Sequence, residues 1–276
     1  MTRMFGFIGN RADVGARVLE LHPSVLQVHP QADHPVGWGV GFYQSGEVLL
    51  RRRPLDERSE IDLSEVVNSL RTDVLVGHVR KPTVGNLRTE NTHPFRYRQW
   101  LFAATSTVPK FEQLRDRVLE SQPEFLRRNV RGDTDTECLL YLFLSFLHDA
   151  GHLADDRVAP DHVRQALRAS LSLVDRLTAE VGGAGQQGNV LLTNGEHLYG
   201  VHRDGTFGYR VLEGKADVEA LLDDEDLRQQ RIPSVENTHF SLVATDMERL
   251  PERWERVEPG SLITFSRVDA PQVEPL

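Results

Sequence analysis

Met1-Thr2-Arg3-Met4-Phe5-Gly6-Phe7-Ile8-Gly9 opens the chain, and its apolar run is the first indication of the fold. From Thr2 to Ile8 the segment is short and apolar after its first residues, a pattern typical of a buried strand. We therefore expect the chain to begin within a sheet, with Thr2 as a polar residue at the start of its first strand.

Outward from this strand, short apolar runs alternate with groups of helical patterns. The segments 37–43 and 47–51 flank Gln44-Ser45-Gly46, which predicts a hairpin. Further strands are expected over residues 74–78, 100–104, 189–193, 197–202, 207–212, 239–245 and 261–266. Helices are expected over residues 61–70, 111–119, 134–148 and 162–181. Strands that look antiparallel, with helices grouped between them, indicate α+β layers rather than a doubly wound parallel sheet.

The chain is expected to form a single domain over residues 1–276. A chain of 276 residues is long enough for one large domain or two small ones. The weakest point for a boundary is the segment 182–188, which begins and ends with glycine. Because the strands after this segment can complete the same sheets as those before it, we do not divide the chain there.

Composition narrows the classes of partner. The chain is 39% hydrophobic and 26% charged with a net charge of −9, which argues against nonspecific binding to nucleic acid or to an anionic membrane. No apolar run is long enough for a membrane helix, and the start lacks the features of a signal peptide. The single cysteine, Cys138, excludes an intrachain disulfide and fits a cytoplasmic location. The histidines show no tight metal-binding spacing, so neither a metal nor another cofactor is expected.

Five short motifs follow one another along the chain. They are Gly-Trp-Gly-Val-Gly-Phe-Tyr at 37–43, Gly-His-Val-Arg-Lys-Pro-Thr-Val-Gly at 77–85, Asn-Thr-His-Pro-Phe at 91–95, Gly-Asp-Thr-Asp-Thr-Glu at 132–137 and Asn-Val-Leu-Leu-Thr-Asn-Gly at 189–195. With the opening residues they resemble, in order and over nearly the whole chain, the class II glutamine amidotransferases of the single-domain bacterial branch. The resemblance implies a four-layer αββα sandwich of the N-terminal-nucleophile hydrolase type. It also implies hydrolysis of glutamine or another γ-glutamyl amide as the ancestral reaction.

The resemblance places the α-amino-acid end of the substrate among Arg80, Thr83 and Asp135. An amino acid zwitterion needs a cation for its carboxylate and an anion for its ammonium, and Arg80 and Asp135 supply one of each. The simpler interpretations are a surface arginine near a strand end for Arg80 and a helix cap for Asp135. Because both residues occur in the family's order, the ligand-binding role is favoured.

Residue 2 departs from the family. The resemblance implies a cysteine there, which becomes N-terminal when Met1 is removed and acts as nucleophile with its own α-amine as base. Thr2 fits the same pattern, because an N-terminal threonine can be activated by its own amine. Its hydroxyl is far less acidic than a thiol, and it is β-branched, so a site shaped for cysteine would react slowly with it. The simpler interpretation, a polar residue at the start of a strand, is favoured.

The oxyanion hole departs as well. The family has His-Asn-Gly after a Phe-Ala strand, and this chain has Thr105 and Ser106 in place of the asparagine and the glycine. A threonine hydroxyl is shorter than an amide, and the Cβ of Ser106 restricts the positive-φ backbone that glycine permits. Loss of one oxyanion donor typically costs about 10²–10³ in rate. Thr2, Thr105 and Ser106 are therefore the candidate catalytic residues of a degenerate site.

Three functions are consistent with these departures. The favoured one is a class II glutamine amidotransferase-like protein whose catalysis is lost or much reduced, in effect a pseudoenzyme. The alternatives are a non-catalytic protein that binds a γ-glutamyl ligand or serves as a scaffold, and an active hydrolase with Thr2 as nucleophile. The expected ligand is glutamine or a γ-glutamyl small molecule. If amide nitrogen is transferred, its acceptor would belong to a separate partner enzyme.

Overall fold

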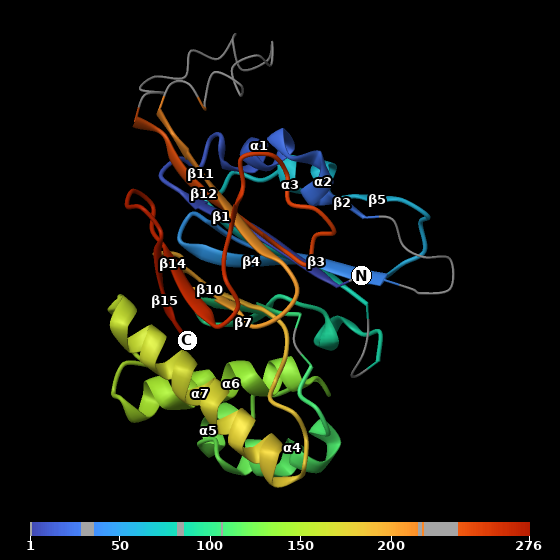
Figure 1. Cartoon of the computed structure of the whole chain (residues 1–276), viewed down its shortest axis with the longest axis vertical. Helices are drawn as coiled ribbons and strands as arrows, with labels where there is room; N and C mark the ends of the chain where they lie inside the picture. The colour runs from blue at the N-terminus through green and yellow to red at the C-terminus, as the bar shows by residue number, and fades with distance from the viewer. Residues whose placement is uncertain (1, 29–35, 82–85, 106, 215–216, 218–236) are drawn as a thin grey trace.

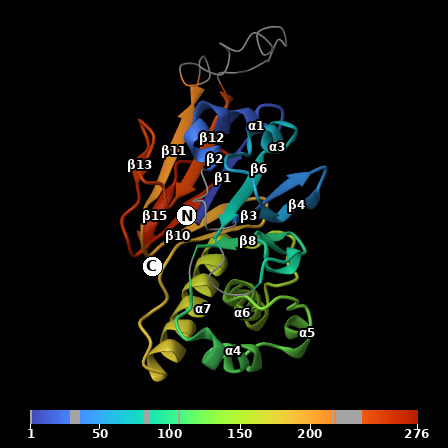
Figure 2. The same cartoon turned by 90° about the vertical axis from the view of Figure 1, so that its right-hand side faces the viewer.

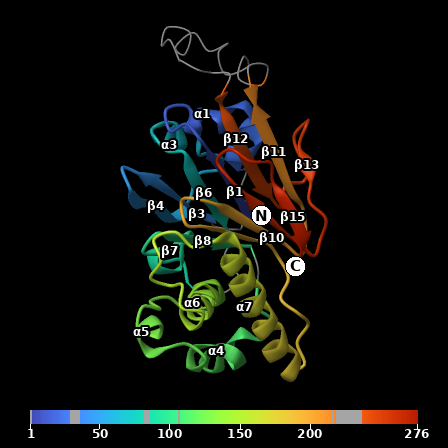
Figure 3. The ribbon, with the colours of Figure 1, turned by 90° about the vertical axis from the view of Figure 1, so that its left-hand side faces the viewer.

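The computed structural model describes residues 2–28, 36–81, 86–105, 107–214, 217 and 237–276. They form four layers, in which two sheets pack face to face and helices cover the outer face of each sheet (Figure 1). Views from the two sides keep the same order of layers (Figures 2 and 3). The four-layer α+β sandwich expected from the sequence is therefore confirmed.

Seven strands form the first sheet. They are β1 (Arg3–Gly9), β3 (Val36–Gln44), β4 (Glu47–Asp56), β6 (Val74–Arg80), β11 (Phe207–Glu213), β12 (His239–Thr245) and β13 (Glu255–Arg256). Their order across the sheet is β13-β11-β12-β1-β6-β3-β4, and every neighbouring pair is antiparallel. The strand that opens the chain thus lies in the middle of this sheet.

Six strands form the second sheet. They are β7 (Phe95–Tyr97), β8 (Trp100–Ala104), β9 (Val190–Thr193), β10 (Leu198–His202), β14 (Ser261–Phe265) and β15 (Gln272–Pro275). Their order is β15-β14-β10-β9-β8-β7, so β8 and β9 pair although the segment 182–188 separates them in the chain. Strands from both sides of that segment also meet in the first sheet, where β1 pairs with β12.

Short helices cover the first sheet, and a second group, which includes the longest helices, covers the second. The first group is α1 (Gly15–Val18), η1 (Leu19–Leu21), α2 (Pro23–Leu26) and α3 (Ser64–Asn68). The second group is α4 (Phe111–Glu120), α5 (Glu124–Arg127), α6 (Asp135–Asp149) and α7 (Pro160–Glu180). One further turn of helix, η2 (Thr89–Asn91), lies in the connection between the sheets. Among the described residues, no helix has the length and apolar character to cross a membrane.

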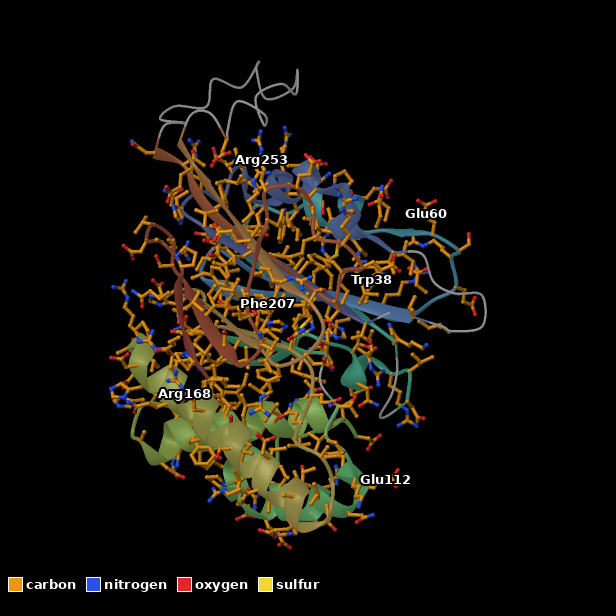
Figure 4. All side chains as sticks on the ribbon, in the orientation of Figure 1. Trp38, Glu60, Glu112, Arg168, Phe207 and Arg253 are labelled. Atoms are coloured by element: carbon orange, nitrogen blue, oxygen red, sulfur yellow. The ribbon has the colours of Figure 1, made fainter. Side chains whose placement is uncertain are left out.

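The alternation of side chains along β1 explains how one strand serves two layers. Met4 and Ile8 belong to the apolar cluster between the sheets, whereas Phe5 and Phe7 pack beneath the first group of helices. Successive residues of a strand point to opposite faces, so a strand apolar at every position is buried on both. Phe207, also in the cluster between the sheets, is labelled in Figure 4.

One predicted element is wrong. Residues 61–70 do not form a single helix: Ile61–Asp62 is a short strand, β5, paired with β2 (Gln27–Val28), and α3 begins only at Ser64. The carboxylate of Asp62 accepts the backbone N–H of Ser64 at 2.8 Å. Such local bonds from Asp compete with helix formation and favour a turn. The other expected strands and helices are present with boundaries shifted by a few residues.

Candidate functional site

Four of the six predicted site residues line one small pocket of about 30 Å³, where β1 begins and where β6 and β8 end. They are Thr2, Arg80, Thr105 and Asp135. The pocket is completed by His78, Lys81, His93, Ala104, Thr134 and Thr136. The other two predictions, Thr83 and Ser106, lie outside the described residues.

Strand geometry brings these residues together. Arg80 lies four positions after Val76 on β6. Because side chains alternate between the two faces of a strand, Arg80 projects from the same face as Val76, which packs between the sheets. β1 runs antiparallel to β6 with Arg3 opposite Val79, which places Thr2 beside the end of β6. The facing sheet contributes the end of β8, so Thr105 follows directly at the pocket.

Asp135 is a buried carboxylate held by backbone donors. It is 5% exposed, and its Oδ2 accepts the N–H of Val108 at 2.7 Å while Oδ1 accepts the N–H of Thr136 at 2.9 Å. Burial nevertheless raises the pKa of this carboxyl above its usual range. The helix is capped by Thr134, whose hydroxyl accepts the N–H of Glu137 at 3.3 Å. The N-terminus of α6 is therefore capped without Asp135. Among the described residues, none forms an ion pair with the Asp135 carboxylate.

Arg80 lines the same pocket. It is 5% exposed, and its Nη1 donates to the carbonyl of Asn86 at 3.2 Å. The carboxylate of Asp135 is the charge that favours its protonated form. A buried cation and a buried anion thus line one pocket, the complement of an amino acid zwitterion.

A frame of side chains ties the Arg80 loop to the Asp135 helix. The amide of Asn91 donates to the carbonyl of Asn86 at 3.0 Å and accepts the N–H of Asp133 at 2.9 Å. Glu137 accepts the N–H of Gly132 at 2.6 Å. A Cβ on Gly132 would lie 2.3 Å from the Asn91 oxygen, so only glycine permits this approach. Two motifs recognised in the sequence are therefore one structural unit.

The Gly-Trp-Gly hairpin supports the same unit from the first sheet. A Cβ on Gly39 would lie 2.1 Å from the carbonyl oxygen of His93, too close for any side chain. The absence of a side chain at this position therefore lets the loop that carries His93 pack directly on β3. Glycine is required here for close approach of two backbones rather than for an unusual φ angle.

Two histidines with their rings in contact, tilted by 38°, line the pocket. The ring of His78 lies 4.1 Å from that of His93, centroid to centroid, and its Nε2 lies 3.1 Å from the carbonyl oxygen of Ala104. Because a carbonyl can only accept, this nitrogen carries the proton. Burial lowers the pKa of His78 to about 3 and that of His93 well below its usual value. Both rings are therefore neutral near pH 7 and fix the end of β8 as hydrogen-bonding groups.

The hydroxyl of Thr2 contacts backbone rather than another catalytic group. It lies 3.4 Å from both the carbonyl oxygen and the N–H nitrogen of Lys81, the residue after β6. These long bonds continue the pairing between β1 and β6 by one step. Thr2 is thus at the pocket, as predicted, and its observed contacts are those of a polar residue at a strand start.

The hydroxyl of Thr105 is engaged away from the pocket. It accepts the N–H of Asn189 at 3.1 Å, and its hydrogen bond to Asp246 favours the ionised form of that carboxyl. The hydroxyl of Thr105 therefore lies next to both Asn189 and the Asp246 carboxyl. Thr245 donates to the same carboxylate at 2.6 Å. Burial outweighs these donors and raises the pKa of Asp246 above its usual range.

The sequence interpretation did not identify this second cluster. Asp246 lies at the end of β12 with φ of 56°, and the amide of Asn189 lies 3.3 Å from its Oδ1. An electrostatic interaction with His202, which is 1% exposed, favours the ionised form of Asp246. No local pattern marks these residues, because they come from β9, β10 and β12 and meet only in the folded chain. Asn189, at the start of the fifth motif, was the one available signal.

Cys138 is not a displaced nucleophile. It lies on α6, is 1% exposed, and burial raises the pKa of its thiol to about 12. A thiol with such a pKa carries almost no thiolate near neutral pH. It is therefore an inert part of the apolar core beneath the second sheet.

Comparison with known proteins gives one family. The model described as class II glutamine amidotransferases matches residues 19–274. A protein of Methanocaldococcus jannaschii is 25% identical over 255 residues, a match that covers 86% of this chain and 62% of that protein. The chain therefore spans less than two thirds of the length of this relative.

Two solved structures show the fold. A glutamine aminotransferase class-II domain protein from Silicibacter pomeroyi superimposes with a TM-score of 0.61 at 18% identity, covering 99% of this chain and 98% of that one. The glutamine phosphoribosylpyrophosphate amidotransferase of B. subtilis superimposes with a TM-score of 0.55 at 13% identity, covering 99% of this chain and 49% of that one. The sandwich is thus the N-terminal-nucleophile type that the sequence predicted.

Proposed function

The chain belongs to the class II glutamine amidotransferase family, and we propose that it binds the α-amino-acid end of glutamine or of a γ-glutamyl compound, with amide cleavage lost or much reduced. Arg80 would hold the α-carboxylate, Asp135 the α-ammonium, and Thr83 would assist. The proposal takes residues 1–276 as one amidotransferase domain that acts inside the cell.

The observation that carries the binding half is the pair of buried opposite charges in one pocket. Both Arg80 and Asp135 are 5% exposed. Among the described residues, Oδ2 of Asp135 accepts only the N–H of Val108, which leaves a lone pair for a ligand ammonium. A buried carboxylate with a raised pKa gains most when a cation neutralises it. A zwitterion supplies that cation and, at its other end, a carboxylate that the Arg80 guanidinium can bind.

The contacts of the two hydroxyls support the loss of cleavage. Stabilising an oxyanion requires a donor aimed at the developing charge, but the Thr105 hydroxyl accepts the N–H of Asn189 and lies next to Asp246. Attack requires the Thr2 hydroxyl, with its own α-amine as base, to face the substrate carbonyl, but this hydroxyl lies 3.4 Å from backbone atoms of Lys81. Two independent parts of the reaction would therefore have to be rearranged before cleavage could begin.

A second candidate function is an active hydrolase, favoured by the position of Thr2 in the same pocket as Arg80 and Asp135. In that mechanism the Thr2 hydroxyl oxygen attacks the γ-carbonyl carbon of the substrate, and the hydroxyl proton passes to the α-amine of Thr2. The C–N bond then breaks, the leaving amine takes this proton, and water hydrolyses the resulting ester. Removal of Met1 is a condition, because a peptide-bonded nitrogen is no base.

Either function leaves the nitrogen acceptor to another protein. If ammonia is released and used, a separate synthase would consume it. If nothing is cleaved, the protein would present or sense the bound γ-glutamyl ligand, or support a partner enzyme as a scaffold.

Calorimetric titration with three related compounds tests the binding proposal. L-Glutamine carries both charges, glutaramic acid lacks the ammonium, and 4-aminobutanamide lacks the carboxylate. The proposal predicts that L-glutamine or γ-glutamylglycine binds, and that each analogue with one charge binds at least tenfold more weakly than L-glutamine. Failure of both L-glutamine and γ-glutamylglycine to bind the folded protein would rule it out.

A further inference from the structure

A second pocket, of about 570 Å³, lies beside the frame that holds Asp135. It is lined by residues of β4, η2, β7 and α6 and by the turns next to them. Its volume is within the range of about 300–1,000 Å³ that is usual for small-molecule sites. It shares no lining residue with the proposed glutamine site, although Phe95 and Glu137 belong to two of the motifs.

The charge of this pocket is opposite to that of the whole protein. Its lining includes the arginines Arg52, Arg96, Arg98 and Arg131 and the acidic residues Glu90 and Glu137. The pocket therefore has an excess of two positive charges on a chain whose net charge is −9. Concentration of one sign of charge in a concave site attracts ligands of the other sign.

None of these four guanidinium groups forms an ion pair within the described ranges. Arg52 donates to the carbonyls of Thr89, at 3.3 Å, and Pro94, and its guanidinium lies 5.9 Å from the ring centroid of Phe95. Carbonyls and an aromatic face hold this cation in place without cancelling its charge.

Arg98 and Arg131 have even fewer partners. The guanidinium of Arg98 lies 5.5 Å from the ring centroid of Tyr97, and the described residues give its donors no acceptor. The side chain of Arg131 has none either, although its charge influences Glu137 and Tyr141. Planar guanidinium forks with unused donors are suited to bidentate binding of phosphate or carboxylate.

The acidic residue nearest to these cations is already engaged. Glu137 is 5% exposed and accepts the N–H of Arg131 at 3.1 Å and that of Gly132 at 2.6 Å. Tyr141 packs edge-on against Tyr97, with ring centroids 5.9 Å apart. Burial raises the pKa of Tyr141 to about 12, so the phenol remains a hydrogen-bond donor near neutral pH.

We propose that this pocket binds a small molecule with two or more anionic groups, a phosphate ester or a polycarboxylate, through Arg98, Arg131 and the fixed cation of Arg52. The faces of Phe95 and Tyr97 are approached by Arg52 and Arg98, so recognition depends on charge rather than on stacking of a ligand ring. A second, anionic ligand would thus bind independently of glutamine.

Calorimetry with inorganic phosphate, pyrophosphate and citrate at constant ionic strength tests this proposal. Pyrophosphate or citrate is expected to bind more tightly than phosphate, and the preferred one identifies the ligand class. The double variant Arg98→Gln/Arg131→Gln is expected to weaken this binding at least tenfold. Both side chains are exposed, so the variant should fold, and its thermal melting curve checks this.

The matched control is Arg176→Gln/Arg253→Gln, which removes the same charge elsewhere. Arg176 is exposed on α7, and Arg253 lies at the far end of the molecule (Figure 4). This control should bind within about twofold of the wild type, since screening weakens effects beyond a Debye length of about 10 Å. Equal weakening in both double variants would overturn the proposal, as would no binding of any of the three probes at millimolar concentration.

Discussion

The two halves of the pocket differ in what their polar groups contact. In the binding half, Asp135 and Arg80 are buried, carry charge, and are held by backbone groups from separate loops. In the catalytic half, Thr2 and Thr105 are neutral hydroxyls whose bonds go to Lys81, Asn189 and Asp246.

The two halves therefore differ in the free-energy cost of burying their polar groups, which is high for the two charges and low for the two hydroxyls. Burying a charge costs free energy that hydrogen bonds or an opposite charge must offset, and the proposed zwitterion would add to that offset at both Arg80 and Asp135. A hydroxyl that bonds locally has no such cost and gives no sign of a reacting partner. The halves can therefore be tested separately, and the following variants do so in order of expected effect.

Removing either charge of the binding half should have the largest effect. Asp135→Asn and Arg80→Gln each leave the other ligand-binding charge in place while losing one charged hydrogen bond, which costs about 2–5 kcal/mol at buried sites. We expect L-glutamine affinity to fall at least about 100-fold in calorimetric titration. The exposed neighbours provide matched controls, Asp133→Asn and Arg88→Gln, which should bind within about threefold of the wild type.

Rebuilding the catalytic half should have the next largest effect. The triple variant Thr2→Cys/Thr105→Asn/Ser106→Gly restores the residue types that the family resemblance implies. Glutamate release from L-glutamine should rise at least about 100-fold, the usual contribution of one oxyanion donor. Thr105→Asn/Ser106→Gly alone is the control and should remain near the wild-type rate. If the triple variant binds glutamine, has lost Met1 by intact mass and still releases no glutamate, the assignment of these three positions is wrong.

Gly39→Ala tests whether the hairpin supports both halves. The added Cβ would lie 2.1 Å from the carbonyl oxygen of His93, so the backbone must shift. Overpacking of this kind costs about 1–3 kcal/mol, which chemical denaturation would detect as a lower free energy of unfolding. The control is Gly185→Ala, whose Cβ would have only an ordinary contact at 3.4 Å with Asp175, and an equal loss there would contradict the explanation.

Glutamine affinity should fall moderately at acidic pH. Burial raises the pKa of Asp135, so a proton competes with the ligand ammonium at a higher pH than for an ordinary aspartate. The charges of free glutamine do not change between about pH 4.5 and 7.5, so a several-fold loss of affinity on lowering the pH would report the protein. The same raised pKa favours the protonated folded state, so this group contributes stability on acidification and loses it as pH rises through the folded pKa. A constant affinity across this range would show that Asp135 does not hold the ammonium.

Most of the fold could be predicted from local patterns. Each signal lies within one continuous stretch of sequence. Examples are the apolar run of β1, the turn residues Gly46 and Gly195, and the helical spacing of α7. The exception at residues 61–70 arose because the N–H of Ser64 donates to the carboxylate of Asp62 and the helix begins only at Ser64. Periodicity alone cannot distinguish this pattern from a continuous helix.

The pocket was predictable only as far as its motifs reach. Arg80 and Asp135 follow from motif order, and the structure brings both to one pocket. The surroundings of the Thr105 hydroxyl include Asn189 and Asp246, and Asp246 lies 141 residues along the chain and belongs to none of the motifs. The role of this hydroxyl could not be assigned from sequence, because a hydroxyl at this position suits either an oxyanion hole or a buried carboxylate.

The most direct test of a binding site without cleavage compares wild type with Thr2→Ala for glutamate release. Both are assayed with L-glutamine and with a γ-glutamyl anilide, on protein shown by calorimetry to bind L-glutamine. We predict that release is no faster with the wild type than with Thr2→Ala. Release by the wild type that disappears in Thr2→Ala would contradict the account and establish Thr2 as the nucleophile of an active amidohydrolase.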